Sequence, residues 1–370
     1  MTHAIIKEKT PIGITPQFKL NQIILQGSVL GPLKCSVQMD SLGRDSLSED
    51  SEYNGLYKYK SVLDLPALGM LDDVLGVSVC SYKSIELNVI INSKIECKNL
   101  RLSGDKCYKL HISKKTKNKN ISQNCPFKLK VHSNELKSTK KASYLGDILN
   151  EQGSFDDSTM NRRNKAIGIT NQIMSMITSI SLGMFYFQIC FLLRESMFLN
   201  AILTNVESWA PVSQHTINTF VKSDTELLRR FYNAPLSTCQ ELLFLEGGRL
   251  PINFVISKRR LMYLWHILTR DTNELVRKVY FVQSIKCTPG DWFLMIQSEK
   301  IKYKILLSDE EISKLSKNKF KTIVNTHVEK YALSFLIERG KKHSKSQNII
   351  KYMNTSKLQQ QKYLSNKTLT

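Results

Sequence analysis

Two adjacent carboxylates, Asp72 and Asp73, stand in the segment Met70-Leu71-Asp72-Asp73 between apolar flanks. Neighbouring carboxylates repel each other unless a cation lies close to them. Mg²⁺ is the usual cation in such places, because it is held by one or two carboxylates together with substrate phosphates. The pair therefore predicts a Mg²⁺ site for phosphate chemistry, and the alternative is a solvated polar turn.

The residues around the pair indicate a β-hairpin that carries it. Apolar and β-branched residues flank the acidic tip over 68–79, a pattern that favours a hairpin over a helix. A helix over 84–100 and a strand over 108–112 follow. The inner side of that helix is expected to consist of Ile85, Leu87, Val89, Ile90, Ile91 and Ile95. Successive strand residues point to opposite faces, so we expect only one carboxylate of the pair to bind metal directly.

Three further groups stand in order around the pair. Upstream, Gln26-Gly27-Ser28 reads as a turn that caps a helix over 32–42, whose free N–H groups would face a phosphate or a template backbone. Downstream, Lys106 precedes the strand at 108, and Tyr144-Leu145-Gly146-Asp147 reads as a tight turn that Gly146 permits. Each group also has a plain structural alternative: a capped helix start, a surface lysine and an ordinary turn.

In this order and spacing, the four groups resemble the reverse transcriptases of non-LTR retrotransposons, from the middle of the palm into the thumb. The resemblance covers residues 10 to 210 and is weaker beyond. It implies attack of a primer 3′-hydroxyl on the α-phosphate of a dNTP, templated by RNA and assisted by two Mg²⁺ ions. Met70 departs from the family, which usually carries an aromatic residue there.

The resemblance also implies a role for each group. Asp72 would bind both metal ions, and Asp73 would be more peripheral. Lys106 would protonate the pyrophosphate leaving group, a place where a cationic donor is useful because negative charge develops there. The nucleotide and template pocket would be lined by Gln26, Gly27 and Ser28, and the primer end would be gripped by Tyr144, Leu145 and Gly146.

The charge balance agrees with a nucleic-acid partner. The chain has 53 Lys+Arg against 32 Asp+Glu, a formal net charge of +21. Such an excess suggests a polyanion as partner, although a basic protein without one remains the alternative. We expect the RNA template and DNA primer to contact basic residues through their phosphates, without sequence readout. The residues expected to do so are Lys128, Lys130, Lys140, Lys141, Arg162, Arg163 and Lys165.

Other metal sites and membrane segments are not predicted. The eight cysteines form no Cys-x-x-Cys pair and the seven histidines show no ligand spacing, so neither a zinc ribbon nor a His-type site is expected. Scattered cysteines favour a reducing compartment, which is intracellular, either the nucleus or the cytoplasm. The apolar run 182–193 is too short to span a bilayer, so we expect no membrane partner.

The expected fold class is α+β, with a partial polymerase palm in front and helices behind. A small antiparallel sheet with backing helices should be followed by an all-helical thumb and a C-terminal helical region. Helix breaks are expected at Gly183, Pro235, Gly247-Gly248 and Pro289-Gly290. The side chains expected to be mostly buried are Leu192, Phe198, Ile202, Trp209 and Trp265.

The predicted domains follow from these elements. A partial palm over 1–115 leads into a basic connection with the primer-grip-like hairpin over 116–156. Thumb-like helices over 157–210 and a C-terminal helical region over 211–340 come next. The last segment, 341–370, has many polar residues and few apolar anchors, so we expect a poorly ordered tail.

One expected carboxylate has no counterpart. In the family, the first catalytic aspartate lies on a strand upstream of the Gln-Gly turn, whereas residues 1–25 hold one acid, Glu8. We therefore expect a truncated copy with an incomplete two-metal site and little activity alone, unless another polypeptide supplies the missing palm and fingers. The alternatives are a non-catalytic nucleic-acid-binding remnant of a retroelement protein and a helical protein-interaction domain.

Overall fold

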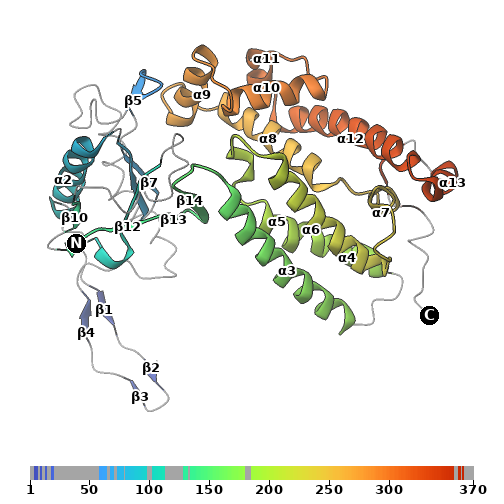
Figure 1. The fold of residues 1–370 in the computed structure, drawn as a ribbon, viewed down its shortest axis with the longest axis horizontal. Coiled ribbons are helices and arrows are strands. Elements are labelled where there is room, and N and C mark those ends of the chain that lie inside the picture. Colours follow the sequence, from blue (N-terminus) through green and yellow to red (C-terminus); the bar gives the residue numbers. More distant parts are fainter. Residues whose placement is uncertain are drawn as a thin grey trace. The chain divides into compact units, whose positions relative to one another are not determined.

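The computed structural model divides the chain into two compact units, unit 1 (Met1–Ser154) and unit 2 (Phe155–Thr370) (Figure 1). The fold is mixed α+β and mostly helical, and every strand among the described residues belongs to unit 1. The structure describes residues 4–6, 9–10, 13–14, 18–20, 58–64, 67–70, 73–78, 80–97, 102–112, 128–131, 134–179, 185–353, 357–359 and 361.

The strands of unit 1 form short two-stranded ladders (Figure 1). One ladder is parallel, between β9 (Tyr108–Leu110) and β12 (Lys137–Thr139). The antiparallel ladders are β1 (Ala4–Ile6) with β4 (Phe18–Leu20), β2 (Lys9–Thr10) with β3 (Gly13–Ile14), β5 (Lys58–Tyr59) with β6 (Leu63–Asp64), β7 (Ala67–Met70) with β8 (Asp73–Gly76), β10 (Lys130–Val131) with β11 (Asn134–Glu135), and β13 (Lys141–Tyr144) with β14 (Asp147–Asn150).

Helix α2 (Ser81–Cys97) backs the β7–β8 hairpin, as predicted for the helix over 84–100. A Cβ at Gly76, the last residue of β8, would lie 3.1 Å from side-chain atoms of both Leu87 and Ile91, so the strand packs directly on the helix. Two amide side chains on α2, Asn88 and Asn92, donate hydrogen bonds of 2.7 and 2.9 Å to the carbonyl oxygen of Lys130 in β10.

The buried side of α2 is narrower than predicted. Leu87 and Ile95 are buried, whereas Ile85 and Val89 are 41% and 60% exposed. Six apolar positions within eleven residues cannot all face one side of a helix, since side chains three and four apart share a face. The strand predicted over 108–112 is confirmed as β9.

Unit 2 is helical in its described residues. Its first half runs through α3 (Asp156–Thr178), α4 (Tyr186–Leu193), the π-helical turn η3 (Arg194–Phe198), α5 (Leu199–Ile202), η4 (Val206–Ser208) and α6 (Gln214–Tyr232). Its second half consists of α7 (Gln240–Gly247), α8 (Ile252–Leu268), α9 (Leu275–Ile285), α10 (Trp292–Lys302), α11 (Asp309–Lys314), α12 (Lys317–Lys341) and α13 (Ser344–Tyr352).

Two hydrophobic cores hold unit 2 together, and two helices contribute to both. The first core lies among α3 to α7, and the second among α8 to α12. Helix α8 places Ile256 in the first core and Leu261 in the second. Helix α12 likewise places Leu336 in the first core and Phe320 in the second. Because each of these helices buries two sides, the two cores form one unit.

The helix ends follow local sequence signals. The side chains of Ser213, Ser308 and Ser316 cap α6, α11 and α12 by accepting backbone N–H groups. Helix α7 ends at Gly248 with a φ of 60°, a left-handed conformation that glycine adopts without strain. The breaks predicted at Pro235, Gly247-Gly248 and Pro289-Gly290 are confirmed, since α6 and α9 end before the two prolines and α7 ends at Gly247.

Close packing requires glycine at Gly247. A Cβ there would lie 2.6 Å from the hydroxyl oxygen of Tyr232 and 2.7 Å from the ring of Phe191. Both aromatic rings belong to the first core or pack against it. The glycine therefore lets α7 approach the α4–α6 layer more closely than any larger residue would allow.

One of the five burial predictions needs correction. Phe198, Ile202 and Trp209 are at most 1% exposed, as predicted. Trp265 is mostly buried, as predicted: it packs against the second core, and its indole N–H donates to the carbonyl oxygen of Leu315 at 2.9 Å. Leu192 is instead 62% exposed, because α4 turns Phe191 inward.

The boundaries predicted at residues 210 and 340 fall inside unit 2, which is one compact unit. Trp209, before the boundary expected after residue 210, packs against Phe220 beyond it. Residues 344–352, expected in a poorly ordered tail, form α13, and Ile350 and Met353 join the first core. A Cβ at Gly340 would lie 2.6 Å from Ile350, so the small residue on α12 lets α13 pack closely.

Some predictions concern residues that the structure does not describe. The helix expected over 32–42 and the break expected at Gly183 lie outside the described residues. No helix among the described residues is both long enough and apolar enough to cross a membrane.

Candidate functional site

The acidic hairpin predicted over 68–79 is confirmed. β7 and β8 pair antiparallel with Met70 opposite Asp73 and Leu68 opposite Leu75, so the strands leave two residues of sequence between them. The β-branched and leucine residues on these strands suit a ladder that is buried on one side. Asp73 is exposed at the start of β8, and Asp72 lies outside the described residues.

A second hairpin, β13–β14, carries the predicted primer-grip residues. Tyr144 pairs with Asp147 across the turn, and the two central residues, Leu145 and Gly146, have φ angles of 49° and 84°. Two positive φ angles define a turn of the type I′ family, whose twist matches that of the flanking strands. The tight turn predicted at Gly146 is therefore confirmed, with leucine in a strained position beside it.

Electrostatics connects these two hairpins. Burial raises the pKa of the half-buried Tyr144 phenol, and the negative charge of Asp73 raises that pKa further. The effect places Asp73 within electrostatic range of the Tyr144 phenol. Unit 1 thus contains both the carboxylate and the turn, which the sequence separates by seventy residues.

Lys106 lies on a different part of unit 1. It is the last residue of a short 3₁₀ turn, η1 (Gly104–Lys106), and one residue separates it from β9; its side chain is exposed. β9 pairs with β12, and β12 is followed directly by the β13 strand of the Tyr144 hairpin. The ammonium is therefore available to solvent in the unit that carries Asp73.

Most of the predicted nucleic-acid-binding residues have accessible side chains. Those on unit 1 and the α3 residue Lys165 are exposed, and Arg163 is half-buried. Lys128 is 3.2 Å from Glu135, but the side chains are 71% and 47% exposed, so this ion pair is weak. The exposed basic residues are Lys128, Lys130, Lys140, Lys141 and Lys165.

Arg162 is an exception, and its predicted role is corrected. The residue is 3% exposed, donates hydrogen bonds to the carbonyl oxygens of Ile202 and Thr204, and places its guanidinium 4.5 Å from the ring centroid of Trp209. A buried guanidinium used in this way holds α3 against the segment after α5. It does not belong to a nucleic-acid surface.

The predicted nucleotide and template residues cannot be placed. Gln26, Gly27 and Ser28 lie outside the described residues, as Asp72 does. An exposed carboxylate such as Asp73 has the oxygen chemistry that Mg²⁺ prefers. Within the described part of unit 1, however, no three potential metal ligands lie together. Of the predicted pair of Mg²⁺ ligands, Asp73 is the one that the structure describes.

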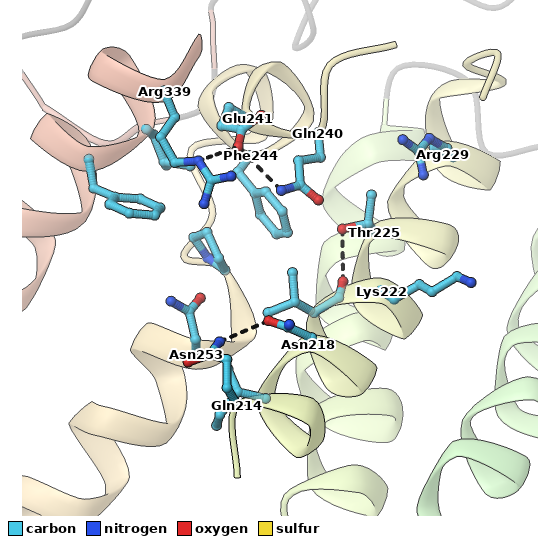
Figure 2. Close-up of a pocket in the computed structure, with 15 residues that line it drawn as sticks. Gln214, Asn218, Lys222, Thr225, Arg229, Gln240, Glu241, Phe244, Asn253 and Arg339 are labelled. Carbon is cyan, nitrogen blue, oxygen red and sulfur yellow. Dashed lines mark hydrogen bonds and ion pairs between the residues drawn. The ribbon is translucent and has the colours of Figure 1, made fainter. Parts of the chain in front are cut away.

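Unit 2 contains a polar cavity that the sequence did not indicate (Figure 2). Its volume is about 330 Å³, and it lies among α6, α7, α8 and α12. Figure 2 shows amide and charged side chains on its walls, beside the ring of Phe244. The polar lining consists of Gln214, Asn218, Lys222, Thr225, Arg229, Gln240, Glu241, Asn253 and Arg339.

Glu241 is the only carboxylate on the cavity wall and is 3% exposed. Its Oε1 is 3.3 Å from Nε of Arg339 and accepts a 3.2 Å hydrogen bond from Gln240 (Figure 2). Burial alone would raise the pKa of this carboxyl. Hydrogen bonds, the largest from Cys239, together with the charge of Arg339 outweigh burial and hold the pKa below its usual range.

The chain has no match among protein-family models, curated proteins or solved structures.

Proposed function

We propose that the chain forms the palm and thumb part of a reverse transcriptase of the non-LTR retrotransposon type. One observation carries this proposal: the acidic hairpin with Asp73 and the hairpin with Tyr144 both form in unit 1, in the order that the resemblance requires. A polymerase palm needs carboxylates beside the primer end, because the primer hydroxyl reacts next to the metal-bound phosphates.

Each of these residues of unit 1 would then have a separate role in the reaction. Asp72 would hold Mg²⁺, which when bound neutralises charge on the dNTP phosphates, and the exposed carboxylate of Asp73 would be more peripheral. The turn at Leu145-Gly146 would support the primer strand. Lys106 would give a proton to the departing pyrophosphate.

The nucleic acid would contact further groups. Gln26, Gly27 and Ser28 would line the nucleotide and template pocket, as the resemblance implies. The exposed lysines of unit 1 and Lys165 on α3 would meet phosphates of the RNA template and DNA primer. The helices between residues 157 and 210 would act as a thumb.

Two measurements on the purified chain test the proposal. With an RNA–DNA primer–template present, dNTP binding should require Mg²⁺ and should be lost in Asp72→Ala. The control is Asp105→Ala, which removes another acid of unit 1 and should keep dNTP binding. Any primer extension by the chain should likewise require Mg²⁺ and be lost in Asp72→Ala. Mg²⁺-dependent dNTP binding that survives in Asp72→Ala would refute the assignment.

A second candidate function is non-catalytic binding of nucleic acid. The observation that favours it is the set of exposed lysines on unit 1, in a chain of net charge +21. It predicts RNA binding that falls steeply with salt, without Mg²⁺-dependent dNTP binding, and with no effect of Asp72→Ala.

A further inference from the structure

Three potential metal ligands meet in unit 2, beside the polar cavity. They are Cys239, Glu241 and His343, and their ligand atoms all lie within 4.8 Å of one another. Cys239 immediately precedes α7, and His343 immediately precedes α13, so the fold brings together the starts of two helices that are far apart in sequence. This cluster is independent of the nucleotidyl-transfer proposal.

The side-chain contacts leave one face of the carboxylate directed at the thiol. The Sγ of Cys239 donates a 3.0 Å hydrogen bond to Oε2 of Glu241. The other oxygen, Oε1, contacts Arg339 and Gln240 instead. A cation bound by Cys239 and Oε2 would replace the shared proton and leave the contacts of Oε1 in place.

Both anionic ligands already have the supporting partners that protein metal sites use. Ligating carboxylates are normally hydrogen-bonded through their second oxygen, as Oε1 of Glu241 is by Gln240 and Arg339. Burial and the hydrogen bond to Glu241 raise the pKa of the Cys239 thiol, and the hydrogen bond with the buried Ser346 hydroxyl opposes this rise. His343 is exposed, so a position beside the imidazole remains accessible to water.

We propose that Cys239, Glu241 and His343 bind a Zn²⁺ ion. A thiolate, an imidazole and a carboxylate are the three donor types that Zn²⁺ accepts, and three protein ligands leave a fourth tetrahedral position for water. On binding, the thiol of Cys239 releases its proton to solvent. The two anionic ligands then balance the charge of the ion, and Arg339 stays outside the coordination shell.

The ion would join the beginning of α7 to the beginning of α13. Helix α13 is held by a few apolar contacts, among them Ile350 beside Gly340. A metal link at His343 adds a restraint at the opposite end of that helix. Zinc should therefore protect the backbone amides of α13 from hydrogen exchange.

Metal titrations of the full chain test the proposal. Co²⁺ replaces Zn²⁺ and reports a bound thiolate through a sulfur-to-metal charge-transfer band, and a chelator competition gives the Zn²⁺ affinity. We expect one Zn²⁺ per chain and a thiolate band in wild type. His343→Ala and Cys239→Ser should each weaken binding by more than the about 10- to 100-fold typical of outer-shell changes.

Matched substitutions keep the test specific. Cys287→Ser and His215→Ala change an exposed cysteine and an exposed histidine outside the cluster, and both should bind Zn²⁺ as wild type does. His343→Ala removes an exposed side chain, so a loss of binding in this variant cannot come from unfolding of a core. Equal Zn²⁺ affinity in wild type and His343→Ala, or a Co²⁺ spectrum without the thiolate band, would overturn the proposal.

Discussion

Arg194 and Asp224 form a two-bond ion pair inside unit 2. Nε and Nη2 of Arg194 each lie 2.7 Å from a carboxylate oxygen of Asp224, and the two side chains are 2% and 0% exposed. Nη2 also donates to the carbonyl oxygen of Leu250 at 2.9 Å. The pair therefore ties the π-helical turn η3 to α6 and to the segment that leads into α8.

Breaking this pair should destabilise unit 2 strongly. Asp224→Asn leaves a buried guanidinium without its counter-charge, which costs about 3–5 kcal/mol. Glu195→Gln is the matched control, because Glu195 pairs with Arg249 at 2.7 Å with side chains 50% and 30% exposed, worth at most about 1 kcal/mol. Urea unfolding measures both, and equal losses in the two variants would contradict the assigned burial.

Arg162 and Lys165 should give opposite phenotypes although they lie one turn apart on α3. Arg162→Ala removes buried hydrogen bonds and should lower the free energy of unfolding by about 2–4 kcal/mol. Lys165→Ala should leave stability within about 0.5 kcal/mol and reduce the salt slope of RNA binding by about 1. Urea unfolding and RNA binding at several salt concentrations check both. An unchanged salt slope in Lys165→Ala would remove that residue from the proposed surface.

The Leu145-Gly146 turn offers a stabilising substitution. Leucine at a φ of 49° costs about 1–2 kcal/mol, whereas asparagine tolerates this conformation better. Leu145→Asn should therefore slow hydrogen exchange of the β13 and β14 amides. Gly146→Ala should accelerate it by straining the backbone alone, because no atom lies within 4 Å of the added Cβ. Faster exchange in Leu145→Asn would contradict the turn geometry.

Local signals allowed the turns and helix ends to be predicted. The tight turn at Gly146 and the helix end at Gly248 depend on backbone conformations that the residue type itself favours. The serine caps at Ser308 and Ser316, which were not predicted, depend on equally local signals. Such features need only a few neighbouring residues, so a single sequence contains enough information for them.

Burial and long-range contacts could not be predicted in the same way. The run 182–193 is almost wholly apolar, so no polar side marks its exposed face, and the exposure of Leu192 gave no signal. Arg162 looks like a surface cation until carbonyl groups of Ile202 and Thr204 meet it in the fold. The Cys239–Glu241–His343 cluster likewise forms only when α13 packs beside α7.

The buried thiol of Cys190 should make unit 2 sensitive to alkali. Burial raises the pKa of Cys190 to about 12, and burial together with the neighbouring thiol raises that of Tyr186 to about 12. An unfolded thiol loses its proton at about pH 8.5, so above that pH deprotonation favours the unfolded state. The stabilisation is thus complete below about pH 8.5 and is lost as pH rises toward 12.

Cys190→Ala isolates this effect. The variant lacks the buried thiol, so its stability deficit relative to wild type should be constant near neutral pH. Above about pH 8.5 the deficit should shrink by about 1.4 kcal/mol per pH unit. Urea unfolding across this pH range provides the measurement, and a deficit that stays constant up to about pH 10 would contradict the buried, neutral thiol.

The central claim is that the acidic hairpin of unit 1 holds divalent metal beside a nucleotide. Mn²⁺ can replace Mg²⁺, and electron paramagnetic resonance counts the Mn²⁺ ions bound to the chain with primer–template and dNTP. The account predicts that the double variant Asp72→Asn/Asp73→Asn loses dNTP-dependent Mn²⁺ binding, while Asp105→Asn retains it. Unchanged dNTP-dependent Mn²⁺ binding in the double variant would contradict the claim.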